Sequence, residues 1–136
     1  MHTSAGYQEI DHTADWALTV WAPDLPGLVE QAALGMFTLS GVVLALSPRV
    51  ARTLSLTGFD PEHLLVKFLS EILFISEEEE LGFDEFHLTL TDLSLTATLS
   101  GAPIASQQKE IKAVTYHDLQ IRHTSRGLEV TIVFDV

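Results

Sequence analysis

The chain of 136 residues has 19 Asp and Glu against 7 Lys and Arg, and its formal net charge of −12 argues against direct, sequence-independent binding to a nucleic-acid backbone. The hydrophobic fraction of 46% predicts one globular domain over residues 1–136, and no apolar run approaches the roughly 20 residues of a membrane span. The absence of cysteine excludes disulfides and thiolate metal sites, and with no visible signal peptide we expect a soluble cytoplasmic protein.

Strand and helix signals alternate in the first half of the chain. Residues 15–22 place Trp16, Leu18 and Val20 on one face, which is the alternation of a half-buried strand. The segment APDLPG then ends the strand and begins a helix, whose C-terminal stop we expect at Gly41. The apolar positions of this helix recur at helical spacing and are Leu28, Val29, Ala32, Ala33, Met36 and Phe37.

A second strand and a more apolar helix follow. The segment VARTLSLTG at 50–58 predicts a strand with Leu54 and Leu56 directed inward. Asp60 followed by Pro61 predicts a helix start, because aspartate is a capping residue and the proline ring is preset for the first turn. We expect this to be the central core helix from its apolar residues, which are Leu64, Leu65, Phe68, Leu69, Ile72 and Leu73. The four glutamates that follow, at 77–80, predict a solvated helix end or loop.

The second half of the chain is rich in strands. Residues 86–101 predict two strands folded about Asp92, and residues 102–110 predict a polar connection. Residues 111–123 and 128–136 predict two further strands, joined by a hairpin at TSRG. Together these elements predict a two-layer α+β single domain, with two main helices packed on a mostly antiparallel sheet.

Acidic groups stand at the start of the first predicted strand and at the end of the last. Asp11, His12 and Asp15 fall within DHTAD, while Asp135 alternates with the core-facing row and Val136 ends the chain with a carboxylate. If these strands are antiparallel neighbours, Asp15, Asp135 and the terminal carboxylate converge. Three neighbouring carboxylates take up protons or bind a cation, and oxygen ligands favour Ca²⁺ or Mg²⁺. From the residues alone, the alternative is that Asp15 caps a turn and Asp135 belongs to a frayed end.

Three further polar residues lie near these segments. His117 shares a predicted strand face with Leu119 and Ile121, which favours a core or rim histidine. His12 is placed to cap or hydrogen-bond the turn that follows it. Lys112 directly precedes a predicted strand and, as a lone lysine, is typical of a solvated charge. The chain contains no glycine-rich phosphate loop and no G-x-S-x-G or H-E-x-x-H motif.

Five segments occur in the order found in the archease family, namely DHTAD at 11–15, ALGMF at 33–37, LLVKFLSEILF at 64–74, IKAVTYH at 111–117 and the terminal IVFDV. The chain resembles this family over nearly its whole length, and DHTAD together with KAVTYH and a penultimate aspartate is specific. The resemblance implies a small acidic α+β protein that is not itself an enzyme but a cofactor of the GTP-dependent RNA ligase RtcB. That ligase joins RNA ends in tRNA splicing and RNA repair. Archeases are thought to promote guanylation of its active-site histidine and so allow multiple turnover.

The resemblance also implies which residues act. Family members bind a divalent cation, often calcium, with Mg²⁺ or Mn²⁺ as alternatives, through residues that match Asp15, Asp135 and the terminal carboxylate of Val136. The lysine of IKAVTYH, here Lys112, is also functionally important in the family. The other expected functional positions within these motifs are Asp11, His12 and His117. The chain departs from the family at Trp16 and Ala17, where an aliphatic residue and glycine are common, and this change bears on strand geometry and on a partner surface.

Two other functions stay open from the sequence. A metal-dependent hydrolase would use the same carboxylates, although no general base accompanies them. A chaperone-like modulator of RNA-processing proteins is an older suggestion for the family, and it predicts effects on several clients that do not depend on GTP.

Overall fold

The computed structural model describes residues 5–10 and 16–136. The structure has two α-helices, α1 (Leu25–Leu39) and α2 (Pro61–Glu79), and strands precede and follow each of them in the sequence. The strands are β1 (Gly6–Ile10), β2 (Trp16–Ala22), β3 (Val43–Leu44), β4 (Val50–Thr57), β5 (Leu81–Thr91), β6 (Ser94–Ser106), β7 (Ala113–Val114), β8 (Arg122–Thr124) and β9 (Gly127–Asp135).

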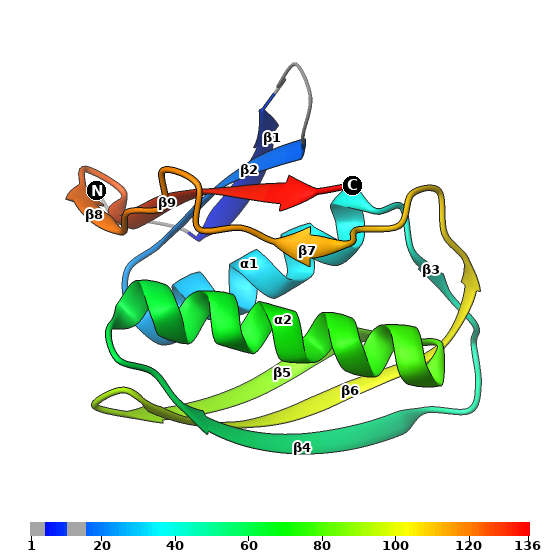
Figure 1. Cartoon of the computed structure of the whole chain (residues 1–136). Helices are drawn as coiled ribbons and strands as arrows, with labels where there is room; N and C mark the ends of the chain where they lie inside the picture. Colours follow the sequence, from blue (N-terminus) through cyan, green and yellow to red (C-terminus); the bar gives the residue numbers. More distant parts are fainter. Residues whose placement is uncertain (1–4, 11–15) are drawn as a thin grey trace.

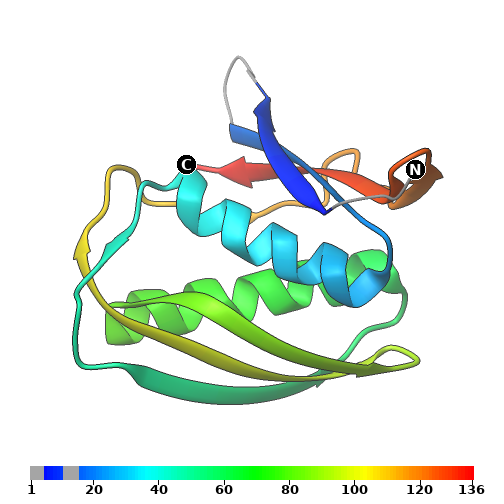
Figure 2. The same ribbon diagram turned by 180° about the vertical axis from the view of Figure 1, so that it is seen from behind.

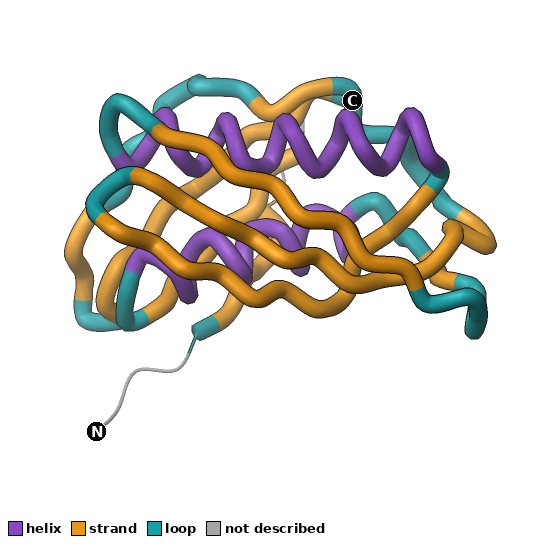
Figure 3. The backbone as a smooth tube through the Cα atoms, turned by 90° about the horizontal axis from the view of Figure 1, so that it is seen from below, coloured by secondary structure: helices purple, strands orange, loops and turns teal. Residues whose placement is uncertain are grey.

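The strands form two antiparallel sheets, and both helices lie between them (Figures 1 and 2). The first sheet has the order β1-β2-β9-β7, with β8 also paired to β9. In the second sheet the long strand β6 pairs with β3, β4 and β5, and these strands cross in front of the helices when seen from below (Figure 3). α1 contacts β2 of one sheet and β5 of the other, which places the core on both sides of the helix layer.

The α+β class, the two main helices and their packing on antiparallel strands are confirmed. Where one sheet was expected, however, the strands are divided between two. The physical reason is visible in α1, whose buried residues span more than one face of the helix, from Leu28 and Val29 through Gly35 to Phe37. A helix with so wide an apolar surface is covered on two sides rather than one.

The helix ends agree with the capping signals. The side chain of Asp60 accepts a hydrogen bond from the backbone N–H of His63 (2.7 Å), and that of Asp24 accepts one from Gly27 (2.9 Å). After α1, Gly41 adopts a positive φ of 68°, a conformation that glycine reaches without strain. The expected helix starts and the stop at Gly41 are therefore confirmed.

The hairpin about Asp92 is confirmed, and its strands are longer than expected. Thr91 pairs with Ser94 across the turn, and Asp92 has a positive φ of 53°. β6 continues to Ser106, so half of the predicted polar connection at 102–110 is strand. The four glutamates at 77–80 are exposed at the end of α2, as predicted.

The prediction of one strand over residues 111–123 is wrong. Only Ala113–Val114 and Arg122–Thr124 are strands, and the chain between them forms a loop. Asp118 adopts a left-handed φ of 50°, and the N–H of Leu119 bonds back to the carbonyl of Tyr116 (3.1 Å), which ends the extended backbone. The carboxylate of Glu62 in α2 accepts from the N–H of Ile121 (2.9 Å) and ties the loop to the helix.

The short strands β1 and β3 were not predicted. β1 pairs with β2 from Gly6↔Trp21 to Ile10↔Ala17 and forms the edge of the first sheet. Within the described part of the chain, no helix is long and apolar enough to cross a membrane.

Candidate functional site

The first predicted strand and the last, which were assumed to pair, are antiparallel neighbours in the structure. β2 and β9 are neighbours in register from Trp16↔Phe134 to Ala22↔Leu128. α1 supports this pair from below, because Gly35 allows a close approach: a Cβ there would stand 2.5 Å from Cδ2 of Leu18. The start of β2 and the end of β9 therefore lie side by side.

The end of β9 presents the side chain of Asp135 to solvent. Ile132 and Phe134 are fully buried on the core side, while Asp135 is exposed and Val136 is half-buried. The predicted alternation of this strand is confirmed, except that Val133 is also buried although it shares a face with Asp135. Figure 1 shows the chain ending at the tip of β9, so the exposed side chain of Asp135 and the terminal carboxylate of half-buried Val136 belong to one dipeptide.

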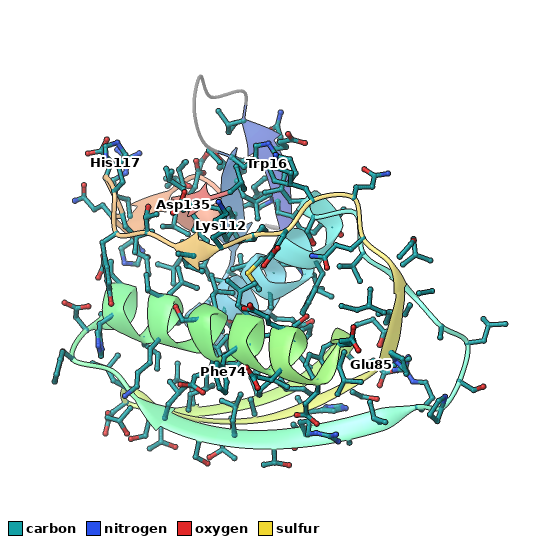
Figure 4. All side chains as sticks on the ribbon, turned by 45° about the vertical axis from the view of Figure 1, so that its right-hand side comes forward. Trp16, Phe74, Glu85, Lys112, His117 and Asp135 are labelled. Atoms are coloured by element: carbon teal, nitrogen blue, oxygen red, sulfur yellow. The ribbon has the colours of Figure 1, made fainter. Side chains whose placement is uncertain are left out.

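Lys112 lies directly beside this end of β9. Its backbone N–H donates a hydrogen bond to the carbonyl of Asp135 (2.8 Å), and the next residue, Ala113, is the strand partner of Asp135. The N–H and the hydroxyl of Thr115 both donate to the carbonyl of Val133, at 3.0 and 2.9 Å, and hold the two strands together. Figure 4 shows Lys112, Asp135 and Trp16 in one region of the molecule. Their spacing in sequence carries no signal of this proximity.

Three of the sequence-predicted residues, Asp11, His12 and Asp15, lie outside the described residues. Asp15 directly precedes Trp16, whose strand partner is Phe134, the residue before Asp135.

The expectation that His117 lies on a strand face is wrong. His117 follows β7 in the exposed loop, with 63% of its side chain accessible, and its Nε2 lies 3.2 Å from the carboxylate of Asp118. Its backbone N–H donates to the hydroxyl of Thr115 (3.2 Å), so the loop turns away after β7.

The described residues alone do not form a side-chain metal site. Within 5–10 and 16–136, no three His, Asp or Glu side chains are close enough together to hold a metal ion. The predicted ligand set combines Asp135 with the main-chain carboxylate of Val136 and with Asp15, and the last of these lies outside those ranges.

Trp16 and Lys109 form a contact that sequence reasoning missed. Trp16 is half-buried against the core, and Nζ of Lys109 lies 5.8 Å from the centre of its ring. Ala17, the other departure from the family pattern, is only 1% exposed and is paired with Val133. The sequence does not predict this contact, because the two residues are 93 positions apart and neither forms a motif with the other.

The perturbed carboxylates lie in ion pairs elsewhere in the molecule. The guanidinium of Arg52 hydrogen-bonds Glu79 and holds the pKa of that carboxyl below its ordinary value, although Glu79 is well exposed. Arg49 does the same for the pKa of Asp84 through a two-point contact at 2.7 and 3.1 Å. The first pair joins β4 to the end of α2, the second joins the residue before β4 to β5, and we assign both a structural role.

Comparison with known proteins gives consistent matches over nearly the whole chain. The model of the Archease protein family matches residues 7–136. Protein archease of Methanosarcina acetivorans is 33% identical, covering 96% of this chain and 95% of its own, and that of Methanothermobacter thermautotrophicus is 29% identical, covering 96% and 99%.

Two solved structures have a similar fold. The solution structure of Methanobacterium thermoautotrophicum protein 1598 has a TM-score of 0.70 at 26% identity, covering 96% of this chain and 99% of that one. The crystal structure of an archease from Thermotoga maritima, described as a possible chaperone, has a TM-score of 0.67 at 21% identity, covering 95% and 96%. The second likeness shows the fold alone.

Proposed function

This chain belongs to the archease family, and on that premise we propose that it is a protein cofactor that activates an RtcB-type RNA ligase. The activity is the one the family resemblance implies: promotion of ligase guanylation and multiple turnover in tRNA splicing or RNA repair. With an RNA ligase as its partner, the protein is proposed to act in the cytoplasm and without enzymatic activity of its own.

The observation that carries the proposal is the meeting of two family motifs at one end of the first sheet. Lys112 of IKAVTYH is hydrogen-bonded to Asp135 of the C-terminal motif, and β9 pairs with the strand that follows DHTAD. Motifs that are far apart in the chain therefore belong to one exposed surface. A net charge of −12 favours a partner whose own surface is basic because it binds RNA.

We further propose that Asp15, Asp135 and the terminal carboxylate of Val136 hold a divalent cation. The donor set fits, since Asp135 is exposed and the donors are carboxylate oxygens, which hard cations such as Ca²⁺, Mg²⁺ and Mn²⁺ prefer. A bound cation would supply positive charge at the contact with the ligase. Lys112 would contact the nucleotide phosphates or an acidic group of the ligase, with Asp11, His12 and His117 as further contacts.

The test is ligation by the matching ligase with RNA in excess, GTP and a divalent cation, with and without this protein. We expect product to stop near one equivalent of ligase without the protein and to continue with it. Asp15→Ala and Asp135→Ala should fold, lose Ca²⁺ binding measured by calorimetry, and lose stimulation because the carboxylate set is broken.

Glu71→Ala is the matched control, since it removes one exposed carboxylate from the solvent side of α2 and should keep full stimulation. Full stimulation by both aspartate variants would contradict the role of the cation site. No stimulation by the wild-type protein, with an active ligase, would contradict the proposed function itself.

A chaperone-like role is the second candidate, and exposed apolar side chains favour it. Apolar side chains such as Leu46 (98% exposed) and Phe59 (87%) are available for contact with clients. This role predicts that the protein suppresses aggregation of several unrelated proteins without GTP. Suppression restricted to the ligase would count against it.

A further inference from the structure

A pocket of about 310 Å³ lies beside the C-terminal turn of α2, and its lining extends to Ile111, the residue before Lys112. Its other wall is the chain that leads from β6 to β7, which faces that end of α2 in Figure 1. Leu73, Ile104 and Ile111 give it an apolar floor. This volume is at the lower limit of small-ligand pockets, roughly 300–1,000 Å³, and suits a single long side chain.

Backbone hydrogen bonds hold both walls of the pocket in place. The N–H of Ile104 donates to the carbonyl of Glu80 (2.9 Å) and so ties β6 to the residue that ends α2. The N–H groups of Gln108 and Lys109 both donate to the carbonyl of Ser40 (3.1 Å each) and anchor the connection to the end of α1. The pocket is therefore formed before any ligand binds.

The rim of the pocket is strongly negative. Glu77, Glu80 and Glu110 line it and are exposed, and none of them takes part in the ion pairs of the described residues. The C-terminal end of α2 adds the negative pole of the helix dipole, with no basic residue in the last turn. Lys109, the basic residue among the lining side chains, lies over the ring of Trp16.

We propose that this pocket binds an arginine side chain of the protein partner. The three glutamates are not close enough together to hold a metal ion, which favours an extended organic cation over a divalent one. An arginine places its apolar stem along Leu73, Ile104 and Ile111 and its planar guanidinium between the carboxylates. That the partner is the ligase rests on the proposed function. That the pocket binds a guanidinium group rests on the pocket's own lining residues and does not depend on the proposed function.

The first experiment tests the pocket without the ligase. Butylguanidinium, which mimics an arginine side chain, is titrated into the full chain while methyl resonances are followed by NMR, with uncharged butylurea as the matched probe. We expect the methyl signals of Leu73, Ile104 and Ile111 to shift with butylguanidinium and not with butylurea. Shifts that are equal for both probes, or absent, would overturn the proposal.

The second experiment tests docking through Glu77→Gln/Glu80→Gln/Glu110→Gln in the ligation assay. We expect the concentration for half-maximal stimulation to rise about tenfold, which corresponds to about 1.4 kcal/mol, with an unchanged maximum. The control Glu71→Gln/Glu78→Gln/Asp92→Asn neutralises three exposed carboxylates outside the pocket and should behave as wild type.

The outcomes separate the pocket from the proposed function. If the pocket variant and the control have the same half-maximal concentration, the pocket is not a docking site. If the wild-type protein does not stimulate ligation, the proposed function fails and the ligase is not the source of the arginine. The methyl shifts still decide whether the pocket takes a guanidinium group.

Discussion

The side chain of Arg126, at the turn between β8 and β9, contacts both Trp21 and Glu129. Its guanidinium carbon lies 3.8 Å from the ring centre of Trp21, and its Nε donates to Oε1 of Glu129 (3.1 Å). The hydroxyl of Thr124 donates to the same oxygen (3.1 Å). The bond from Arg126, followed by that from Thr124, lowers the pKa of Glu129 below its ordinary 4.5 against the opposing effect of burial. The two contacts hold β8 against β9 at the opposite end of β9 from Asp135.

The lowered pKa of Glu129 predicts a pH-dependent contribution to stability. A carboxyl whose folded pKa is depressed stabilises the fold above its unfolded pKa, and loses that contribution as the pH falls through the folded value. We therefore expect Glu129→Gln to reduce the free energy of unfolding at pH 7 by up to about 1 kcal/mol, since such a pair is partly exposed. The difference from wild type should shrink as the pH falls below 4.5.

Urea titrations of both proteins at pH 7, 5 and 3.5 measure this difference. Glu71→Gln is the matched control, because it removes one exposed carboxylate from α2, away from the turn between β8 and β9. A gap of the same size at every pH would show that Glu129 acts through packing rather than through its charge.

At the scale of elements, β4 is the edge strand with the clearest protection. It pairs with β6 on one side only, so the backbone groups of alternate residues point outward along the other side. Nη1 of Arg52 donates to the carbonyl of Ala51 (2.8 Å), and Nζ of Lys67 in α2 donates to the carbonyl of Thr57 (3.2 Å). Two basic side chains thus cover acceptors at both ends of an edge that would otherwise be available to another strand.

Removal of both caps is expected to promote self-association. Arg52→Ala/Lys67→Ala uncovers the two carbonyls of β4, and sedimentation velocity should detect oligomers at concentrations where the wild-type protein is monodisperse. Lys112→Ala/Arg122→Ala loses the same two charges from exposed positions away from β4 and should not associate. Equal association of the two variants would attribute the effect to charge instead of to the strand edge.

At the scale of the whole molecule, one core links both sheets. A single cluster of buried residues includes Leu18 of β2, Phe68 of α2 and Leu99 of β6. α1 contacts strands of both sheets, and α2 contacts β4, β5 and β7. Neither sheet can lose its helix-facing side chains without exposing the core of the other, which favours a single cooperative unfolding transition.

This continuity can be tested with the two tryptophans, which both belong to β2 of the first sheet. Leu99→Ala creates a cavity in the second sheet, where Leu99 is fully buried, and should cost about 2–5 kcal/mol. We expect urea transitions measured by tryptophan fluorescence and by circular dichroism to coincide and to shift together. A fluorescence transition that stays at the wild-type midpoint would show that the two sheets unfold separately.

The local features of this fold were predictable from short stretches of sequence. The caps at Asp60 and Gly41 and the turn at Asp92 depend on residues within a few positions, so their chemistry can be recognised directly. The alternation of the last strand correctly predicted which side of β9 is buried. The loop around Asp118 was missed because a run of mixed polarity, IKAVTYHDLQIRH, supports a strand pattern and contains no strong turn signal.

The candidate site was predictable in part for the same reason. The pairing of β2 with β9 was an assumption that the structure bears out, but the neighbour of Asp135 on the other side was not foreseen. The backbone N–H of Lys112 bonds to the backbone carbonyl of Asp135, 23 positions away. Because this hydrogen bond involves main-chain atoms only, the identity of the two side chains does not predict it. The cation and its ligands stay a prediction.

The sequence by itself determined where the two helices begin, which face of the last strand carries the core residues, and that acidic residues stand at the beginning of the first predicted strand and the end of the last. Only the tertiary structure decided that the strands form two sheets with the helices between them, and that β7 brings Lys112 to the end of β9. The physical reason is that an apolar face specifies burial but not its partner. Pairing is selected among all strands at once, by the packing of the complete core.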